Sequence, residues 1–269
     1  MKSVLLYANG DSGAESRLQA ALDMVRLFDG HLICLQATPF DAFIIGDPLG
    51  GLYSSSAIMD HLRKTDDEHR LRLEERLRRE GVSWDSLHFD GMPAQLIVDR
   101  SRLSDLIVLS LPEEGGTNDG PLSLAADVAI HARTPVLAIP QKSRGLSCLG
   151  PVLVAWNGSQ EASHALRLTV PMLQRASSVH VVTVGEDTVE FPATCAGLYL
   201  SRHGIEAELR EWPREGRSTA DALLNAASTL GAGYVLMGAY GHSRFREAVL
   251  GGATRDMLRN SPVPLLLAH

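Results

Sequence analysis

An internal duplication constrains the fold of this chain more than any other feature of its 269 residues. Near the start of each copy, residues 4–10 (VLLYANG) align with residues 152–158 (VLVAWNG) at an offset of 152 minus 4, or 148. Near the end of each copy, residues 126–137 align with residues 255–266 at an offset of 255 minus 126, or 129. Because a repeated unit folds the same way each time, we expect two similar domains, and the chain is long enough for two ordinary hydrophobic cores.

Within each copy, short apolar runs alternate with stretches whose apolar residues recur at helical spacing. This alternation predicts parallel strands joined by crossover helices. Strands are expected at residues 4–8, 31–36, 86–89, 106–110, 136–139, 152–155, 179–184, 206–211, 234–237 and 264–268. Helices are expected between the strands, in the second copy at residues 160–175, 194–203, 219–230 and 253–259. The predicted fold class is therefore α/β, with two tandem Rossmann-like domains at residues 1–140 and 150–269. Each is expected to be a five-stranded parallel sheet with flanking helices, and the polar segment 141–145 is the expected linker.

Composition excludes several classes of partner. The net charge is -7, with 32 acidic against 25 basic residues, so broad attraction to nucleic acid or to an anionic membrane surface is not expected. No stretch approaches the ~20 apolar residues that span a bilayer.

Cys34, Cys148 and Cys195 are far apart and form no Cys-x-x-Cys pair. They indicate reduced thiols in a cytoplasmic protein rather than a disulfide framework or a zinc site.

A glycine-rich segment in the second copy is the strongest indication of function. Gly238 follows an apolar strand pattern, and two residues separate Gly238 from Gly241. Gly251 and Gly252 precede a helical pattern. Glycines let main-chain N–H groups approach a phosphate. A helix that begins at Gly251 or Gly252 would direct its unpaired N–H groups and positive dipole end at the anion. The spacing Gly-x2-Gly-x9-Gly differs from the Walker loop and from the dinucleotide fingerprint. The simpler alternative is that these glycines only shape a strand-to-helix turn.

This spacing, together with residues 261–264 (SPVP) leading into a last apolar strand, resembles the C-terminal end of the universal stress protein family. Nucleotide-binding members of that family carry Gly-x2-Gly-x9-Gly-Ser/Thr at this place. Gly252 stands where the family has Ser or Thr, so one hydroxyl group for the phosphate is missing, and Thr254 is a candidate to replace it. The resemblance implies domains of the adenine nucleotide alpha hydrolase-like type that bind ATP, ADP or AMP, with Mg²⁺ on the phosphates.

The same resemblance assigns further positions. Asn157 stands where the family often has an Asp that contacts the adenosine, and Val184 stands where main-chain groups read the adenine edge. Taken alone, Asn157 is a turn residue before an N-cap at Ser159, and Val184 is a core residue. His242 is either a donor to phosphate or an exposed loop residue. The predicted nucleotide-binding residues are Ala155, Asn157, Val184, Met237, Gly238, Gly241, His242, Gly251, Gly252, Ala253 and Thr254.

The first copy has lost the glycine pattern. Ser110 and Glu113 replace the first two glycines of the motif, at an offset of 128. Glu113 and Glu114 together would repel a phosphate. We therefore expect one nucleotide site per chain, in the second copy. Universal stress proteins commonly dimerise through their last strands, so the resemblance implies that the two copies form such a pair within one chain. Further self-association stays open.

Two segments of the first copy have no clear counterpart in the second. Residues 40–56 are expected to form a long loop that carries apolar side chains, either as a lid, as a contact surface or as a mobile insertion. Residues 58–80 are expected to form a helix with a solvated, charged face over a stripe of Leu62, Leu73 and Leu77. Neither segment indicates nucleic-acid binding.

The leading hypothesis is a stress-response protein that binds an adenine nucleotide and acts as a signalling or adaptor protein towards an unidentified protein partner. No side chain is placed as a general base for the γ-phosphate and the loop lacks the Walker lysine, so no catalytic residue is assigned and any hydrolysis is expected to be slow. The ten histidines show no metal-site spacing. Two alternatives stay open: an interaction protein that binds no nucleotide, and an enzyme that adenylates a substrate or hydrolyses ATP on the same fold.

Overall fold

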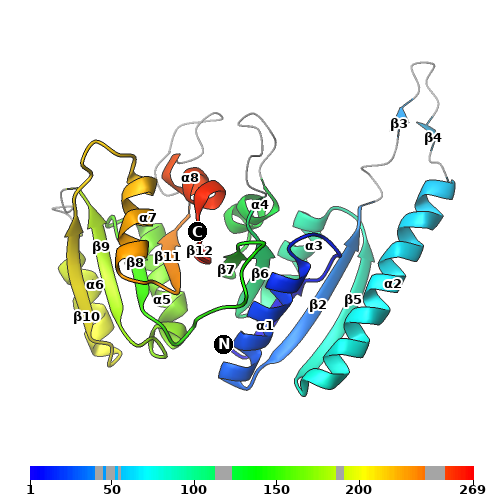
Figure 1. Ribbon diagram of the computed structural model, residues 1–269, viewed down its shortest axis with the longest axis horizontal. Coiled ribbons are helices and arrows are strands. Elements are labelled where there is room, and N and C mark those ends of the chain that lie inside the picture. The colour runs from blue at the N-terminus through cyan, green and yellow to red at the C-terminus, as the bar shows by residue number, and fades with distance from the viewer. Residues whose placement is uncertain (40–44, 47–51, 54–55, 113–122, 186–190, 240–251) are drawn as a thin grey trace.

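A continuous ten-stranded β-sheet forms the centre of the molecule, with helices on both of its faces (Figure 1). This computed structural model describes residues 1–39, 45–46, 52–53, 56–112, 123–185, 191–239 and 252–269. The predicted α/β class is confirmed. None of the helices in these ranges is both long and apolar enough to cross a membrane.

The strands of the large sheet fall into two sets of five, one from each copy of the repeat. The first copy supplies β1 (Ser3–Tyr7), β2 (His31–Thr38), β5 (Ser83–Asp90), β6 (Leu106–Ser110) and β7 (Val136–Ile139). The second copy supplies β8 (Val152–Ala155), β9 (Val179–Val184), β10 (Ala207–Trp212), β11 (Tyr234–Gly238) and β12 (Leu265–Ala268). Within each set all neighbouring strands are parallel.

Two hydrophobic cores lie on the two faces of the sheet, because successive side chains of a strand point to opposite sides. One core is covered by α1 (Ala14–Phe28), α2 (Ser56–Glu80), α5 (Gln160–Leu173) and α6 (Ala193–Arg202). The other is covered by α3 (Pro93–Arg100), α4 (Leu124–His131), α7 (Thr219–Thr229) and α8 (Gly252–Asn260). Burial on both faces explains why the inner strands read as nearly continuous apolar runs.

The structure departs from the sequence-based elements in two places, both in the first copy. Strand β5 begins at Ser83 rather than at residue 86, because it is an edge strand in which exposed and half-buried residues alternate, and polar Ser83 and Asp85 flank Trp84 at its start. Within the long loop expected at residues 40–56, the short strands β3 (Ile45–Gly46) and β4 (Leu52–Tyr53) pair in antiparallel fashion, and residue 56 already belongs to α2. The remainder of that segment up to residue 55 lies outside the described residues.

The two copies are joined through their last strands. The order across the sheet is β10-β9-β8-β11-β12-β7-β6-β1-β2-β5, and β12 pairs with β7 in antiparallel fashion. At this junction Leu266 lies opposite Leu137, and neither side chain is exposed to solvent. The expected pairing of the copies within one chain is therefore observed, and the junction is as deeply buried as the centre of either copy.

Strand order also fixes where each copy can bind a ligand. In both copies the sequence of strands across the sheet is third, second, first, fourth, fifth. The order therefore reverses between the first and fourth strands, which are β8 and β11 in the second copy and β1 and β6 in the first. In open α/β sheets, ligands bind beyond the carboxyl ends of the strands at such a reversal.

Truncation at the junction tests whether the sheet behaves as one unit. Leu266→Ala should lower the free energy of unfolding by about 2 to 5 kcal/mol, because it leaves a cavity in a fully packed site. Urea unfolding followed by circular dichroism should still show one cooperative transition, since both copies share the damaged core. The matched variant Leu103→Ala, at a side chain that is 93% exposed, should change stability by less than about 0.5 kcal/mol. Two separate transitions, with only one of them shifted by Leu266→Ala, would contradict this description.

Candidate functional site

The predicted site residues of the first strand and its following turn lie at the carboxyl edge of the second copy. Ala155 ends β8, and its neighbour in register on β9 is Val182. Asn157 is exposed, and its Oδ1 accepts a hydrogen bond of 3.2 Å from the N–H of Ser159. The Ser159 hydroxyl in turn accepts the N–H of Ala162 at 3.1 Å and caps α5. The turn-and-cap interpretation of this segment is confirmed, and it leaves the Asn157 side chain at the surface.

The fourth strand brings Met237 and Gly238 beside this turn, because β11 pairs with β8. Met237 is buried in the core on the α7 and α8 face. Gly238 has a structural role that the sequence reasoning missed. A Cβ atom at Gly238 would lie 2.5 Å from the main-chain nitrogen of Ala162 and 2.6 Å from the carbonyl carbon of Glu161. Glycine is therefore needed at this position for the first turn of α5 to pack against β11.

Helix α8 begins at Gly252, as the sequence predicted. Gly252 is exposed, a Cβ there would meet no heavy atom of the described residues within 4 Å, and the first turn of the helix carries no acidic side chain. Such a helix start can receive an anion. Thr254 is only 5% exposed, so it is poorly placed to supply the hydroxyl group that Gly252 lacks, while Ala253 is half-buried. Gly241, His242 and Gly251 lie outside the described residues.

Val184 ends β9, on the far side of β8 from β11. Its side chain is half-buried and packs against the core on the α7 and α8 face, as the core interpretation predicts. The structure thus gathers Ala155, Val184, Met237 and Gly238 at the carboxyl ends of three adjacent strands.

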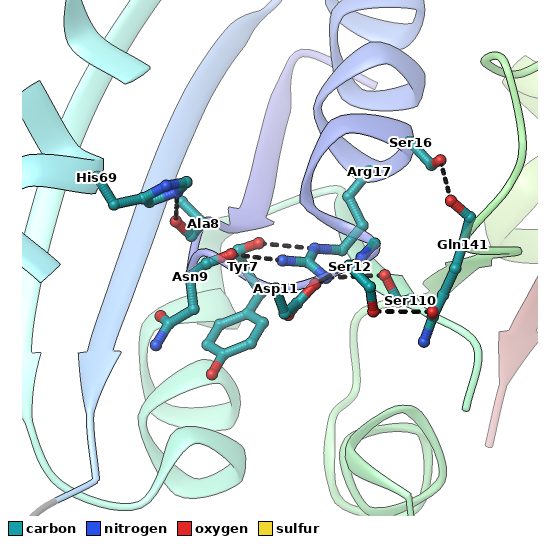
Figure 2. Close-up of polar contacts among 11 residues, drawn as sticks. Tyr7, Ala8, Asn9, Asp11, Ser12, Ser16, Arg17, His69, Ser110 and Gln141 are labelled. Carbon is teal, nitrogen blue, oxygen red and sulfur yellow. Dashed lines mark hydrogen bonds and ion pairs between the residues drawn. The ribbon is translucent and has the colours of Figure 1, made fainter. Parts of the chain in front are cut away.

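The equivalent crevice in the first copy is filled by the protein's own side chains (Figure 2). The Arg17 guanidinium is 1% exposed and lies beyond the end of β1. Its Nε donates to the carbonyl oxygen of Tyr7 at 3.0 Å, and its Nη2 donates to that of Asn9 at 2.8 Å. Its Nη1 donates to both carboxylate oxygens of Asp11, at 2.7 and 2.9 Å, and to the hydroxyl of Ser110 at 2.8 Å. The arginine therefore bridges the ends of β1 and β6.

Tyr7 occupies further space in the same crevice. The centre of the Arg17 guanidinium lies 5.4 Å from the centroid of the Tyr7 ring. Burial raises the pKa of Tyr7 to about 12, and the nearby Arg17 charge offsets part of that effect. The phenol is therefore neutral, and the half-buried ring packs against the core of the first copy.

The corresponding positions of the second copy carry small side chains. At the offset of 148, Tyr7 corresponds to Ala155 and Arg17 corresponds to Ala165. The helix alignment is supported by burial, since the buried residues of α1 from Arg17 to Val25 match those of α5 from Ala165 to Leu173 almost position for position. Two bulky groups that fill the crevice of the first copy are thus replaced by two alanines in the second.

In both copies the fourth strand approaches the start of the first helix closely, but the glycine at this contact lies in different elements. It is Gly238 on the strand in the second copy and Gly13 before the helix in the first. In the first copy a Cβ at Gly13 of the turn before α1 would lie 2.2 Å from the Ser110 hydroxyl oxygen. Gly13 corresponds to Glu161, and Ser110 corresponds to Gly238. A glycine is required on one side of this contact in each copy, and only the second copy places it on the strand. Packing therefore accounts for Ser110, rather than a glycine, at the position of the first copy that corresponds to Gly238.

Comparison with known proteins agrees with this architecture. Residues 149–269 match the model of the Universal stress protein family. The chain is 24% identical to Universal stress protein Slr1230 from Synechocystis sp., with 99% of each protein covered. A universal stress protein from Archaeoglobus fulgidus DSM 4304 superposes with a TM-score of 0.75 at 18% identity, covering 98% of this chain and 97% of that one. A structure of a universal stress protein from Archaeoglobus fulgidus in complex with dAMP is matched over 51% of this chain and 97% of that one, at 20% identity and a TM-score of 0.35.

The two glycines at the ends of the loop should differ sharply in their tolerance of a methyl group. Gly238→Ala should lower the free energy of unfolding by about 1 to 3 kcal/mol, because its Cβ would overlap the main chain of α5. Gly252→Ala should leave stability unchanged or raise it by up to about 1 kcal/mol, because the site is open and alanine favours a helix. Thermal and urea unfolding of the two variants measure both effects. Equal stability of Gly238→Ala and the unmodified protein would show that the α5 contact is not tight.

Proposed function

Residues 149–269 belong to the universal stress protein family and the whole chain has its tandem two-domain form; on that premise we propose that the second copy binds ATP or a related adenine nucleotide. The proposed site lies between the carboxyl ends of β8 and β11. The observation that carries the proposal is the contrast between the copies. Arg17 and Tyr7 fill the crevice of the first copy, whereas the second has Ala165 and Ala155 at the same places.

The start of α8 supports a phosphate in this site. Main-chain N–H groups at a helix N-terminus are unpaired, and the helix dipole contributes typically about 0.3 to 1 kcal/mol towards an adjacent anion. The open space at Gly252 leaves the backbone accessible. Mg²⁺, when bound, would be held by the phosphates themselves. Among the described residues no group of three or more potential metal ligands gathers that would form a separate site.

The proposed role is that of a nucleotide-dependent signalling or adaptor protein in a stress response. Among the predicted site residues that the structure describes, the side chains of Ala155, Asn157, Val184 and Met237 offer an amide and an apolar surface, and none of the four is a carboxylate or an imidazole. The nearby His269 imidazole is engaged with the carbonyl oxygen of Ala239 at 2.9 Å. General-base activation of a water molecule needs such a group within hydrogen-bond distance. Binding, rather than turnover, is therefore the proposed activity, and the bound state is what a protein partner would recognise.

One observation favours a second candidate, an interaction protein that binds no nucleotide. The family hydroxyl is absent at Gly252, and the hydroxyl of Thr254 belongs to a residue that is only 5% exposed. If the phosphate contact depends on a hydroxyl group, the site is too weak to be occupied. A substitution that restores the hydroxyl separates this possibility from the leading proposal.

Titration with a fluorescent ATP analogue tests the proposal, with expected binding of one nucleotide per chain. Ala155→Tyr, which copies Tyr7 into the second copy, should abolish binding while the protein stays folded. Gly252→Ser should bind about tenfold more tightly than Gly252→Ala, because a hydroxyl hydrogen bond to a charged phosphate is worth about 1.5 kcal/mol. The alanine variant isolates the hydroxyl from the added Cβ.

Each outcome distinguishes the candidates. Absence of binding in the unmodified protein together with binding by Gly252→Ser would support the interaction protein. Undiminished binding by folded Ala155→Tyr would show that the nucleotide lies elsewhere. Release of pyrophosphate from ATP on addition of candidate substrates would favour the adenylating enzyme instead.

A further inference from the structure

A separate cavity lies in the first copy, between α1 and α2 over β1. Its volume is about 180 Å³. The apolar part of its wall includes Leu6 of β1 and Ala8, which directly follows that strand. Leu18 of α1 and Leu73 of α2 complete this apolar part. His69, Arg72, Arg76 and Glu15 also line it. The cavity is thus an apolar hollow with charged groups among its walls, on the face of the sheet that α1 and α2 cover.

The repeat explains why this cavity exists. At the offset of 148, Ala8 corresponds to Trp156. The main chains at the two positions are equivalent, because the N–H of Ala8 donates to the carbonyl of Leu35 at 2.8 Å and the N–H of Trp156 donates to that of Val182 at 2.9 Å. Both side chains belong to the core on the same face of the sheet. The second copy therefore places an indole ring where the first copy has a methyl group.

The indole of Trp156 shows what fits such a place. Trp156 is only 3% exposed. Its Nε1–H donates to the carbonyl oxygen of Phe191 at 3.1 Å, and the two ring centroids lie 6.0 Å apart. A fused aromatic ring thus packs against the segment that leads into α6. In the first copy residue 8 supplies only a methyl group to the equivalent space between α1 and α2, and the His69 Nε2 lies 3.0 Å from the carbonyl oxygen of Ala8 in the wall of the cavity that remains.

Size and polarity allow a ligand to take that role. An apolar cavity of about 150 Å³ in another protein is large enough to bind benzene. A cavity of about 180 Å³ that is open at one side can therefore admit a single or fused ring whose substituent reaches the rim.

The arginines of the rim determine which substituent fits. Arg76 is held by Glu15 and Glu80, and its hydrogen bond to Glu15 is the main cause that raises its pKa. Arg72 is less constrained, because its side chain is 73% exposed and its printed contacts are both with Glu68, an exposed hydrogen bond of 3.1 Å from Nε to the main-chain carbonyl and a carboxylate at 3.7 Å from Nη2. Such an exposed pair contributes little to stability. Arg72 can therefore turn to an acidic group at the mouth of the cavity.

We propose that this cavity binds a small aromatic acid with a ring of about indole size. The ring would lie where Trp156 lies in the second copy, and the carboxylate would pair with Arg72. This site is independent of the nucleotide proposal, because it lies in the other copy and uses none of the same residues.

Isothermal titration with indole and with indole-3-acetate tests the proposal. The unmodified protein should bind both compounds, and the acid about tenfold more tightly, as expected for a charge-assisted hydrogen bond. Ala8→Trp should abolish binding of both, because it places the indole covalently in the cavity, and should leave the melting temperature equal or higher. Ala8→Leu, a smaller change, should weaken binding and serves as the decisive variant if Ala8→Trp does not fold.

A pair of arginine variants tests the role of the rim. Arg72→Gln should remove the preference for the acid and leave indole binding unchanged. Arg78→Gln, on the same helix but outside the cavity wall, should bind both compounds like the unmodified protein. Absence of binding of either compound at about 1 mM would overturn the proposal, as would unchanged binding by a folded Ala8 variant. An unchanged tenfold preference in Arg72→Gln would overturn the assignment of the acid to Arg72.

Discussion

The antiparallel pairing of β7 with β12 is the interaction on which the rest of the structure depends. The last strand of a parallel sheet exposes a row of unpaired main-chain groups, and such an edge invites association with other chains. Here each copy covers the open edge of the other, and the paired leucines at the junction are fully buried. The outer edges that remain, β5 and β10, carry polar and charged side chains along much of their length. One chain thus achieves the closure that two separate copies of the domain would need to reach by dimerising.

Once the copies share one sheet, they no longer need to share one function. The first copy keeps the strand order and the buried helices but closes its crevice with Arg17, Asp11 and Tyr7. Every donor nitrogen of the Arg17 guanidinium has a partner within the fold. The second copy has small side chains at the crevice and a large one, Trp156, in the core. Large and small residues have been exchanged between crevice and core, and this exchange distinguishes the proposed roles of the two copies.

Much of this architecture could be predicted from the sequence, because buried strands leave apolar runs and the repeat shows itself at constant offsets. The polar start of β5 could not, since an edge strand lacks that signal. The packing role of Gly238 depends on the distance between β11 and α5, which no local pattern records. The filling of the first crevice was missed, although the offset of 148 already sets Arg17 against Ala165 and Tyr7 against Ala155.

The central claim is that only the second copy has a crevice that an adenine nucleotide can enter. The most direct measurement is a crystal structure of the complete chain grown with saturating ATP and Mg²⁺. The expected result is electron density for one nucleotide between β8 and β11, with its phosphates near the start of α8, and an unchanged Arg17 network in the first copy. Density for a nucleotide at β1 and β6, with Arg17 displaced, would contradict the claim, as would a second copy whose crevice is closed by its own side chains.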